Sequence, residues 1–220
     1  MREHRLARYA PLAGVVFVAL IVLAVIIGGE TPSNGDSALK IARYWKDHDT
    51  EQIWTSVIGA WATVFFVWFA ATLRSTLRKA EEGTGRVSAA CFGGAIVGAT
   101  GFLTMLGINF AIADGADDLS APALKTLTVF SNGFFLPLAV GFAVFFLAAG
   151  ILAVRFAVLP AWLGWFTIVL GVACVTPVGF FALLVGLVWI LVVSIMLYRR
   201  EAGPAERPAP MEPTAPAPAT

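Results

Sequence analysis

The chain contains 220 residues, of which 59% are apolar and only 13% are charged. Ordinary soluble domains are about a quarter charged, so this composition excludes a soluble domain and indicates an integral membrane protein. The net charge of +1 gives no global field that would attract nucleic acid. Arginine outnumbers lysine by 11 to 4 in a chain rich in alanine and glycine. That bias is typical of bacterial genomes of high GC content, so the composition indicates a bacterial protein.

Six segments are long and apolar enough to cross a bilayer, which requires about 20 mostly apolar residues. No small-residue cleavage site directly follows the first segment, so we expect it to be a retained helix and not a signal peptide. The expected spans are 10–28, 53–73, 88–110, 134–154, 160–176 and 178–198. The sequence thus predicts an all-α transmembrane bundle over 10–200. A cytoplasmic segment, 1–9, precedes it, and a disordered Pro/Ala-rich cytoplasmic tail, 201–220, follows it.

The first outer loop, 30–52, contains SALKIARYWKDHDTEQ, which predicts a short interfacial helix. Asp36 or Ser37 would be its N-cap. One side of this helix would carry Ala38, Leu39, Ala42 and Trp45. We therefore expect it to rest on the membrane or on the ends of the spanning helices.

Three tryptophans recur every seven residues in the second span, at Trp54, Trp61 and Trp68. Seven residues is close to two helical turns, so their rings should form one stripe. Two interpretations remain open. The stripe lines an apolar groove for a lipid, a quinone or another flat ligand, or it is ordinary packing and lipid-facing surface.

The third span contains a GxxxG motif formed by Gly94 and Gly98. Small residues let helices approach closely in lipid, where packing holds them together. We expect these glycines to pack inside the bundle, with a homodimer as the alternative. Gly164 and Gly171 in the fifth span offer a matching face.

A second interfacial helix is expected between the third and fourth spans. A single helix over 126–154 would be about 43 Å long, longer than one crossing needs. Residues 131–133, Ser-Asn-Gly, and the following Pro137 offer an interruption. We therefore expect Ser120 to Phe130 to lie along the outer surface as a separate helix.

Polar residues gather near the expected outer ends of the third, fourth and fifth spans: Asn109, Thr128, Ser131, Asn132 and Thr176. If these ends adjoin, the side chains would form a shallow polar vestibule, and Pro137 would leave the carbonyl group of Gly133 free to join it. The sequence therefore offers a candidate small-ligand site. The alternative is a set of interfacial residues hydrated by water.

The stretch RFAVLPAWLGWF, 155–166, predicts a cytoplasmic hairpin. Arg155 would mark the cytoplasmic side, Pro160 is harmless in a first helical turn, and Trp162 and Trp165 suit headgroup depth. One helix over 160–198 would reach about 58 Å, against a hydrocarbon core of roughly 30 Å. We therefore expect a tight outer turn in the sequence TPVG, 176–179.

The distribution of basic residues sets the expected orientation. With the N-terminus inside, cytoplasmic segments contain 11 of the 15 lysines and arginines, and the outer segments contain four. Positive residues favour the cytoplasmic side. The sequence therefore predicts six spans with both termini in the cytoplasm.

The sequence lacks the residues of several membrane chemistries. No ionisable residue lies in the core of any expected span, which argues against carboxylate-coupled transport and intramembrane proteolysis. Two histidines, His4 and His48, on opposite sides cannot hold a haem together. Asp47, His48 and Asp49 are adjacent, and neighbouring helical residues point about 100° apart, so we expect no metal site there. Cys91 and Cys174 should lie at different depths as free thiols.

Three segments resemble a family of uncharacterised integral membrane proteins of actinobacteria: RYWKDH at 43–48, FVWFAATLRSTLR at 66–78 and LPAWLGWFTIVLGV at 159–172. The similarity extends over about 12–198. It implies an all-helical, six-span protein of the bacterial cytoplasmic membrane. It implies no activity, so no residue role is carried over.

These observations predict a protein without catalytic activity, cofactor or metal, whose partners are the lipid bilayer and a membrane protein or a second copy. The small-residue faces and the uncharged spans favour a module that packs against a partner or shapes its local membrane. The alternative is a small permease or carrier for an uncharged or amphipathic molecule. It would use the polar vestibule and the tryptophan stripe.

Overall fold

The structure is a computed structural model that describes residues 9–202, and side chains up to residue 200. Most of the expected N-terminal segment and tail lies outside these residues. Within them the chain is all-helical. In order, its elements are η1 (Ala10–Leu12), α2 (Ala13–Gly28), α3 (Ala38–Asp47), α4 (Asp49–Ala80), α5 (Arg86–Asp114), α6 (Ala121–Gly133), α7 (Phe135–Phe156), α8 (Ala161–Cys174) and α9 (Gly179–Ala202).

Five helical stretches in the described part of the chain are long and apolar enough to cross a membrane: Ala10–Gly28, Asp49–Ala80, Arg86–Asp114, Ala121–Phe156 and Gly179–Arg200. They make the chain a multi-pass membrane protein. Helix α8 is also apolar but has only 14 residues, about 21 Å at 1.5 Å per residue.

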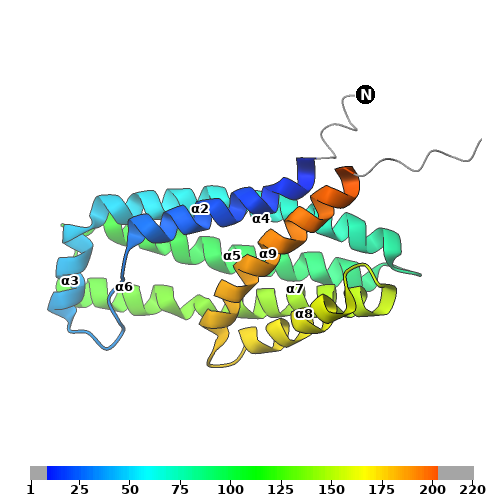
Figure 1. The fold of residues 1–220 in the computed structure, drawn as a ribbon. Coiled ribbons are helices and arrows are strands. Elements are labelled where there is room, and N and C mark those ends of the chain that lie inside the picture. The colour runs from blue at the N-terminus through cyan, green and yellow to red at the C-terminus, as the bar shows by residue number, and fades with distance from the viewer. Residues whose placement is uncertain (1–8, 203–220) are drawn as a thin grey trace, which may run out of the picture.

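Most helices run side by side along the long axis of the molecule, and α9 crosses them diagonally (Figure 1). Aromatic rings from three helices meet in the main core. The ring centroids of Phe66 in α4 and Phe142 in α7 lie 5.1 Å apart, and Phe146 in α7 lies 5.2 Å from Trp189 in α9. Edge and tilted contacts of this kind stabilise the packing of α4, α7 and α9.

Helix α7 lies between the two glycine faces that the sequence indicated. A Cβ atom on Gly94 would lie 2.6 Å from the backbone nitrogen of Phe145, and one on Gly98 would lie 2.9 Å from the Phe142 ring. On the other side of α7, a Cβ atom on Gly164 would lie 2.8 Å from Val154. Gly171 similarly faces Leu147 of α7. The glycines pack internally, but the expected direct match between the two faces is wrong because α7 separates them.

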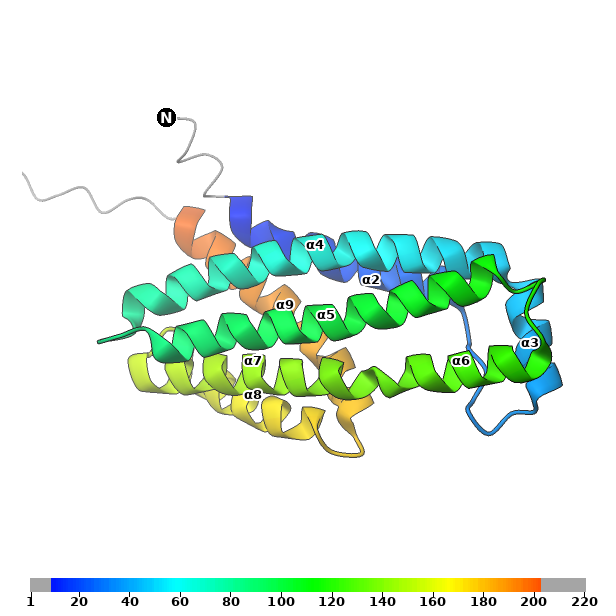
Figure 2. The ribbon, with the colours of Figure 1, turned by 180° about the vertical axis from the view of Figure 1, so that it is seen from behind.

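Helix α6 does not lie along the surface as a separate interfacial helix. It continues almost in line with α7 (Figure 2). Phe134 alone separates the two helices, and its dihedral angles, φ −73° and ψ −3°, remain right-handed helical. The expected break therefore occurs near residues 131–133, but the chain keeps its direction.

Helix α3 lies across one end of the bundle (Figure 1). Ser37 is its N-cap, with its side chain accepting a hydrogen bond from the backbone nitrogen of Lys40. Ile41 and Trp45 are buried in a second hydrophobic cluster with Ile112 and other residues of α5 and α6. Leu39, expected on the packed side, is 76% exposed. Its place is taken by Ile41, which faces the bundle.

The 155–166 stretch forms the turn between α7 and α8, as expected. Arg155 is in the last turn of α7, Ala157 adopts a left-handed conformation with φ 52°, and Pro160 is the N-cap of α8. The guanidinium group of Arg200 in α9 donates a hydrogen bond to the carbonyl oxygen of Val158. This bond joins the end of α9 to the turn between α7 and α8.

Candidate ligand-binding cavity

A cavity of about 720 Å³ lies between the main core and the helix α3 that closes the end of the bundle. Its walls come from α2, α3, α4, α5, α6, α7 and α9, together with residues 31–34 of the loop before α3. Pockets of roughly 300–1,000 Å³ are typical of small-molecule sites. The cavity is therefore large enough for a ligand.

The inner part of the cavity is apolar. Its walls include Phe17 of α2, Phe66 of α4, Phe142 of α7 and Ile190 of α9, all of them buried. These residues also belong to the main core. The apolar wall of the cavity is thus formed by residues of the main core.

The part of the cavity nearest to α3 is polar and uncharged. Asn34, Asn109, Thr128 and Asn132 line it, and none of the described lining residues is charged. Asn132 Nδ2 donates to Asn34 Oδ1 at 2.6 Å, which joins the loop to α6. The indole nitrogen of Trp45 donates to Thr128 Oγ1 at 2.9 Å, which joins α3 to α6.

The side chain of Asn109 in α5 is positioned by a hydrogen bond from Ser131 of α6. The Ser131 hydroxyl group donates to Asn109 Oδ1 at 2.6 Å. Among the described residues, the NH₂ groups of Asn109 and Asn34 and the side-chain oxygen Oδ1 of Asn132 make no hydrogen bond. An asparagine amide provides two N–H donors and a carbonyl acceptor. The three amides therefore keep both donors and an acceptor for a ligand.

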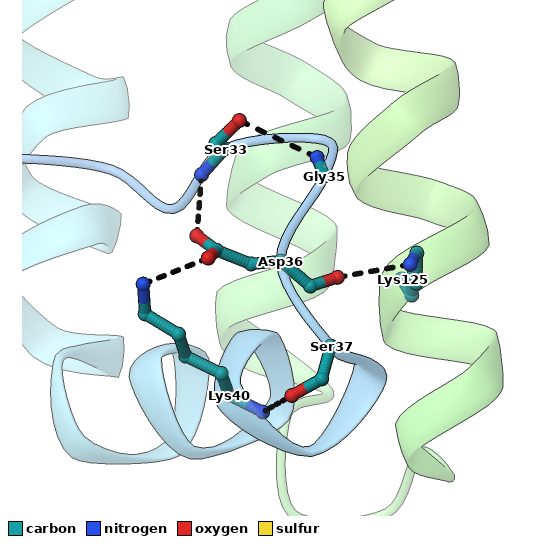
Figure 3. Close-up of polar contacts among 6 residues, drawn as sticks. All are labelled: Ser33, Gly35, Asp36, Ser37, Lys40 and Lys125. Atoms are coloured by element: carbon teal, nitrogen blue, oxygen red, sulfur yellow. Dashed lines mark hydrogen bonds and ion pairs between the residues drawn. The ribbon is translucent and has the colours of Figure 1, made fainter.

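The cover loop, residues 29–37, has a fixed shape at its end before α3 (Figure 3). The Asp36 carboxylate accepts hydrogen bonds from the Ser33 backbone nitrogen at 2.9 Å and from Lys40 Nζ at 2.8 Å. Lys40 and Ser33 therefore hold the pKa of Asp36 below its ordinary value. Lys125 Nζ of α6 donates to the Asp36 carbonyl oxygen at 2.9 Å. These contacts place residues 31–34 against the cavity.

The start of the cover loop is also fixed. The carbonyl oxygen of Gly28 accepts hydrogen bonds from Gln52 Nε2 at 2.8 Å and from the Tyr44 hydroxyl group at 3.2 Å. Gln52 Nε2 also donates to the Tyr44 oxygen at 2.7 Å. The last carbonyl group of α2 is thereby satisfied by side chains of α3 and α4, as an unpaired helix end requires.

Of the five residues expected to form the vestibule, the structure brings four together. Asn109, Thr128 and Asn132 line the cavity, and Ser131 supports Asn109. Thr176 is apart from them and exposed, with its hydroxyl group donating to the Ala173 carbonyl oxygen. The turn between α8 and α9 lies apart from α3 (Figure 1).

The tryptophan stripe of α4 does not line the cavity. Trp54, Trp61 and Trp68 are 57%, 60% and 66% exposed. Phe66, in the same helix, is only 1% exposed and lines the cavity. A surface facing lipid or a partner therefore describes the stripe better than a ligand groove.

The inner part of the cavity was not predicted from the sequence. Its phenylalanines and leucines come from α2, α4, α5, α7 and α9, where they look like ordinary residues of spanning helices. Only the polar residues of the cavity were recognisable as a candidate site from the sequence.

Other candidate chemistry lies outside the cavity. Cys91 and Cys174 are buried free thiols. No group of three or more His, Cys, Asp and Glu side chains within residues 9–200 could hold a metal ion. His48 stacks on Tyr44, with ring centroids 4.7 Å apart.

Comparisons of the chain with protein-family models, with curated proteins and with solved structures found no match.

Proposed function

We propose that this protein is a non-enzymatic, multi-pass membrane protein that binds and carries an uncharged amphipathic molecule. The observation that supports this proposal best is the 720 Å³ cavity, with an apolar inner part and three asparagine amides at its outer end. A ligand with an apolar body and a polar end would satisfy both parts.

An uncharged ligand fits the cavity better than an ion. Burying a charge without a partner is expensive, and none of the described lining residues could pair with one. The polar groups of the lining are hydroxyls, amides and the Trp45 indole. These groups bind by hydrogen bonds, and none is a typical general base such as a carboxylate or an imidazole. Binding without catalysis is therefore the simplest function.

The proposed topology has six spans in a bacterial cytoplasmic membrane, with α8 as the short fifth span and both termini in the cytoplasm. Its support comes from the described part of the chain, where seven basic residues lie on the side of the α4–α5 and α7–α8 turns and four lie on the α3 side. In this orientation α3 lies at the outer interface. The cavity then belongs to the outer half of the membrane.

Transport and binding in reconstituted vesicles test the proposed function. Asn109→Leu combined with Asn132→Leu removes two amides from the cavity, and at about 1 kcal/mol for each hydrogen bond the affinity should fall by at least about tenfold. Thr100→Val is the matched control, because Thr100 is exposed on α5 and outside the lining. Uptake, efflux and binding that equal those of protein-free vesicles would exclude a carrier.

A module that packs against a membrane partner or a second copy is the second candidate. The exposed stripe of Trp54, Trp61 and Trp68 favours it. The glycine faces do not, because α7 already covers them inside the bundle. Mild solubilisation and light scattering distinguish the candidates: a stable dimer or hetero-complex supports packing, and a monomer without a co-purifying protein contradicts it.

A further inference from the structure

The volume of the cavity limits the size of its ligand. At roughly 30 Å³ for each non-hydrogen atom with its hydrogens, the share of a water molecule in the liquid, 720 Å³ holds about 24 such atoms. A lipid with one chain and a small head fits this volume. A phospholipid with two acyl chains does not.

The distribution of polar groups sets the direction of the ligand. Asn109 and Ala99, both in α5, line the cavity. They are ten residues apart, which is about 15 Å along the helix. The amides of Asn34 and Asn132 are at the Asn109 end, and Phe66 and Phe142 are in the apolar part. A polar head at Asn109 therefore leaves a chain to run along α5 into the core.

The cavity opens beside α9, towards the apolar side surface of the bundle. Phe180 and Leu184 line the cavity and are also 59% and 44% exposed. At the other end of α9, Tyr198 stacks on Tyr9 beside η1, with ring centroids 6.2 Å apart. From that contact α9 runs diagonally away from α2 (Figure 1). Exposed apolar side chains in a spanning helix face lipid, so this opening faces the bilayer.

We infer that the ligand is a single-chain lipid with a neutral, hydrogen-bonding head, and that it reaches the cavity sideways from the bilayer between α2 and α9. This inference rests on the proposed function and makes it more specific. The head binds the asparagine amides beneath the cover loop, and the chain lies along α5. Neither step requires the ligand to pass through water.

Photolabelling of the full chain in vesicles tests the ligand class. Three probes carry the same diazirine in an acyl or alkyl chain: a monoacylglycerol, an alkyl trimethylammonium and a two-chain phosphatidylcholine. Each is incorporated in the vesicle lipid beforehand. We expect the monoacylglycerol to label cavity residues of α5 and α9 about tenfold more than the other two. In a second set of vesicles the monoacylglycerol is added from water, and labelling in this set alone would overturn the lateral route.

Two tryptophan variants of α9 show whether the labelling depends on the cavity. Leu183→Trp fills the cavity, because Leu183 lines it. Val188→Trp introduces the same side chain at a position that is 60% exposed and outside the lining. We expect about tenfold less labelling for Leu183→Trp and no change for Val188→Trp. Should Leu183→Trp lose its helical circular dichroism, Asn109→Leu must reduce labelling by the monoacylglycerol instead.

The outcomes separate the two proposals. If no probe labels the cavity residues and Leu183→Trp changes nothing, the cavity binds no ligand and the proposed function fails. If the cationic or two-chain probe labels as well as the monoacylglycerol, and Leu183→Trp blocks all three, binding stands. The single-chain neutral class is then wrong.

Discussion

The carboxylate of Glu81 accepts hydrogen bonds from the backbone nitrogens of Val87 at 2.9 Å and Ser88 at 3.0 Å, and thereby caps the N-terminus of α5. Positive φ angles at Gly83 (83°) and Gly85 (72°) turn the chain back so that Glu81 can reach these groups. Burial alone would raise the pKa of Glu81, but the bonds from Ser88 and Val87 and the nearby charge of Arg78 bring it below its ordinary value.

Because the folded pKa of Glu81 is lowered, its contribution to stability is present above the unfolded value of 4.5 and is lost as pH falls through the folded value. Glu81→Gln should therefore lower the free energy of unfolding at neutral pH by about 1 kcal/mol. Thermal unfolding in detergent should show this difference shrinking below pH 4.5. Glu82→Gln is the control, because Glu82 is exposed. A pH-independent difference would contradict the capping role.

At the scale of elements, local patterns predicted where helices begin and end better than how they are directed. Ser37 was one of two expected N-caps, and the break before Pro137 was expected. The predicted direction of α6, along the outer surface, was wrong, because Phe134 interrupts the helix without leaving helical dihedral angles. The GxxxG motif of α5 indicated close packing, but nothing local identified α7 as its partner.

The approach of α5 to α7 is closest at Gly141. A Cβ atom there would lie 2.1 Å from the backbone nitrogen of Gly98 and 2.4 Å from its Cα, so the two helices would have to separate. Gly141→Ala should therefore destabilise the protein by about 3 kcal/mol, the upper range for overpacking. Gly107→Ala is the control, with no atom within 4 Å of its Cβ. Equal unfolding midpoints for the two variants would contradict this contact.

At the scale of the whole molecule, the proposed orientation predicts which turns are accessible from outside the cell. In a chain whose native cysteines are replaced, Glu30→Cys and Asp118→Cys should react with a membrane-impermeant maleimide on intact cells. Glu82→Cys and Arg155→Cys should react only after permeabilisation. All four positions are exposed. The reverse pattern would invert the topology, and a mixed one would change the number of spans.

The sequence by itself determined that this is a helical membrane protein, where most helices lie, and which polar residues could meet. These properties depend on apolar length and on local turn residues, both of which are read along the chain. Only the tertiary structure decided that α7 separates two glycine faces and that the polar residues cover a deep apolar cavity. The physical reason is that core-facing and lipid-facing side chains are both apolar in a membrane. Trp61 and Phe66 of α4 look equivalent in sequence, yet Trp61 is 60% exposed and Phe66 is 1% exposed and lines the cavity.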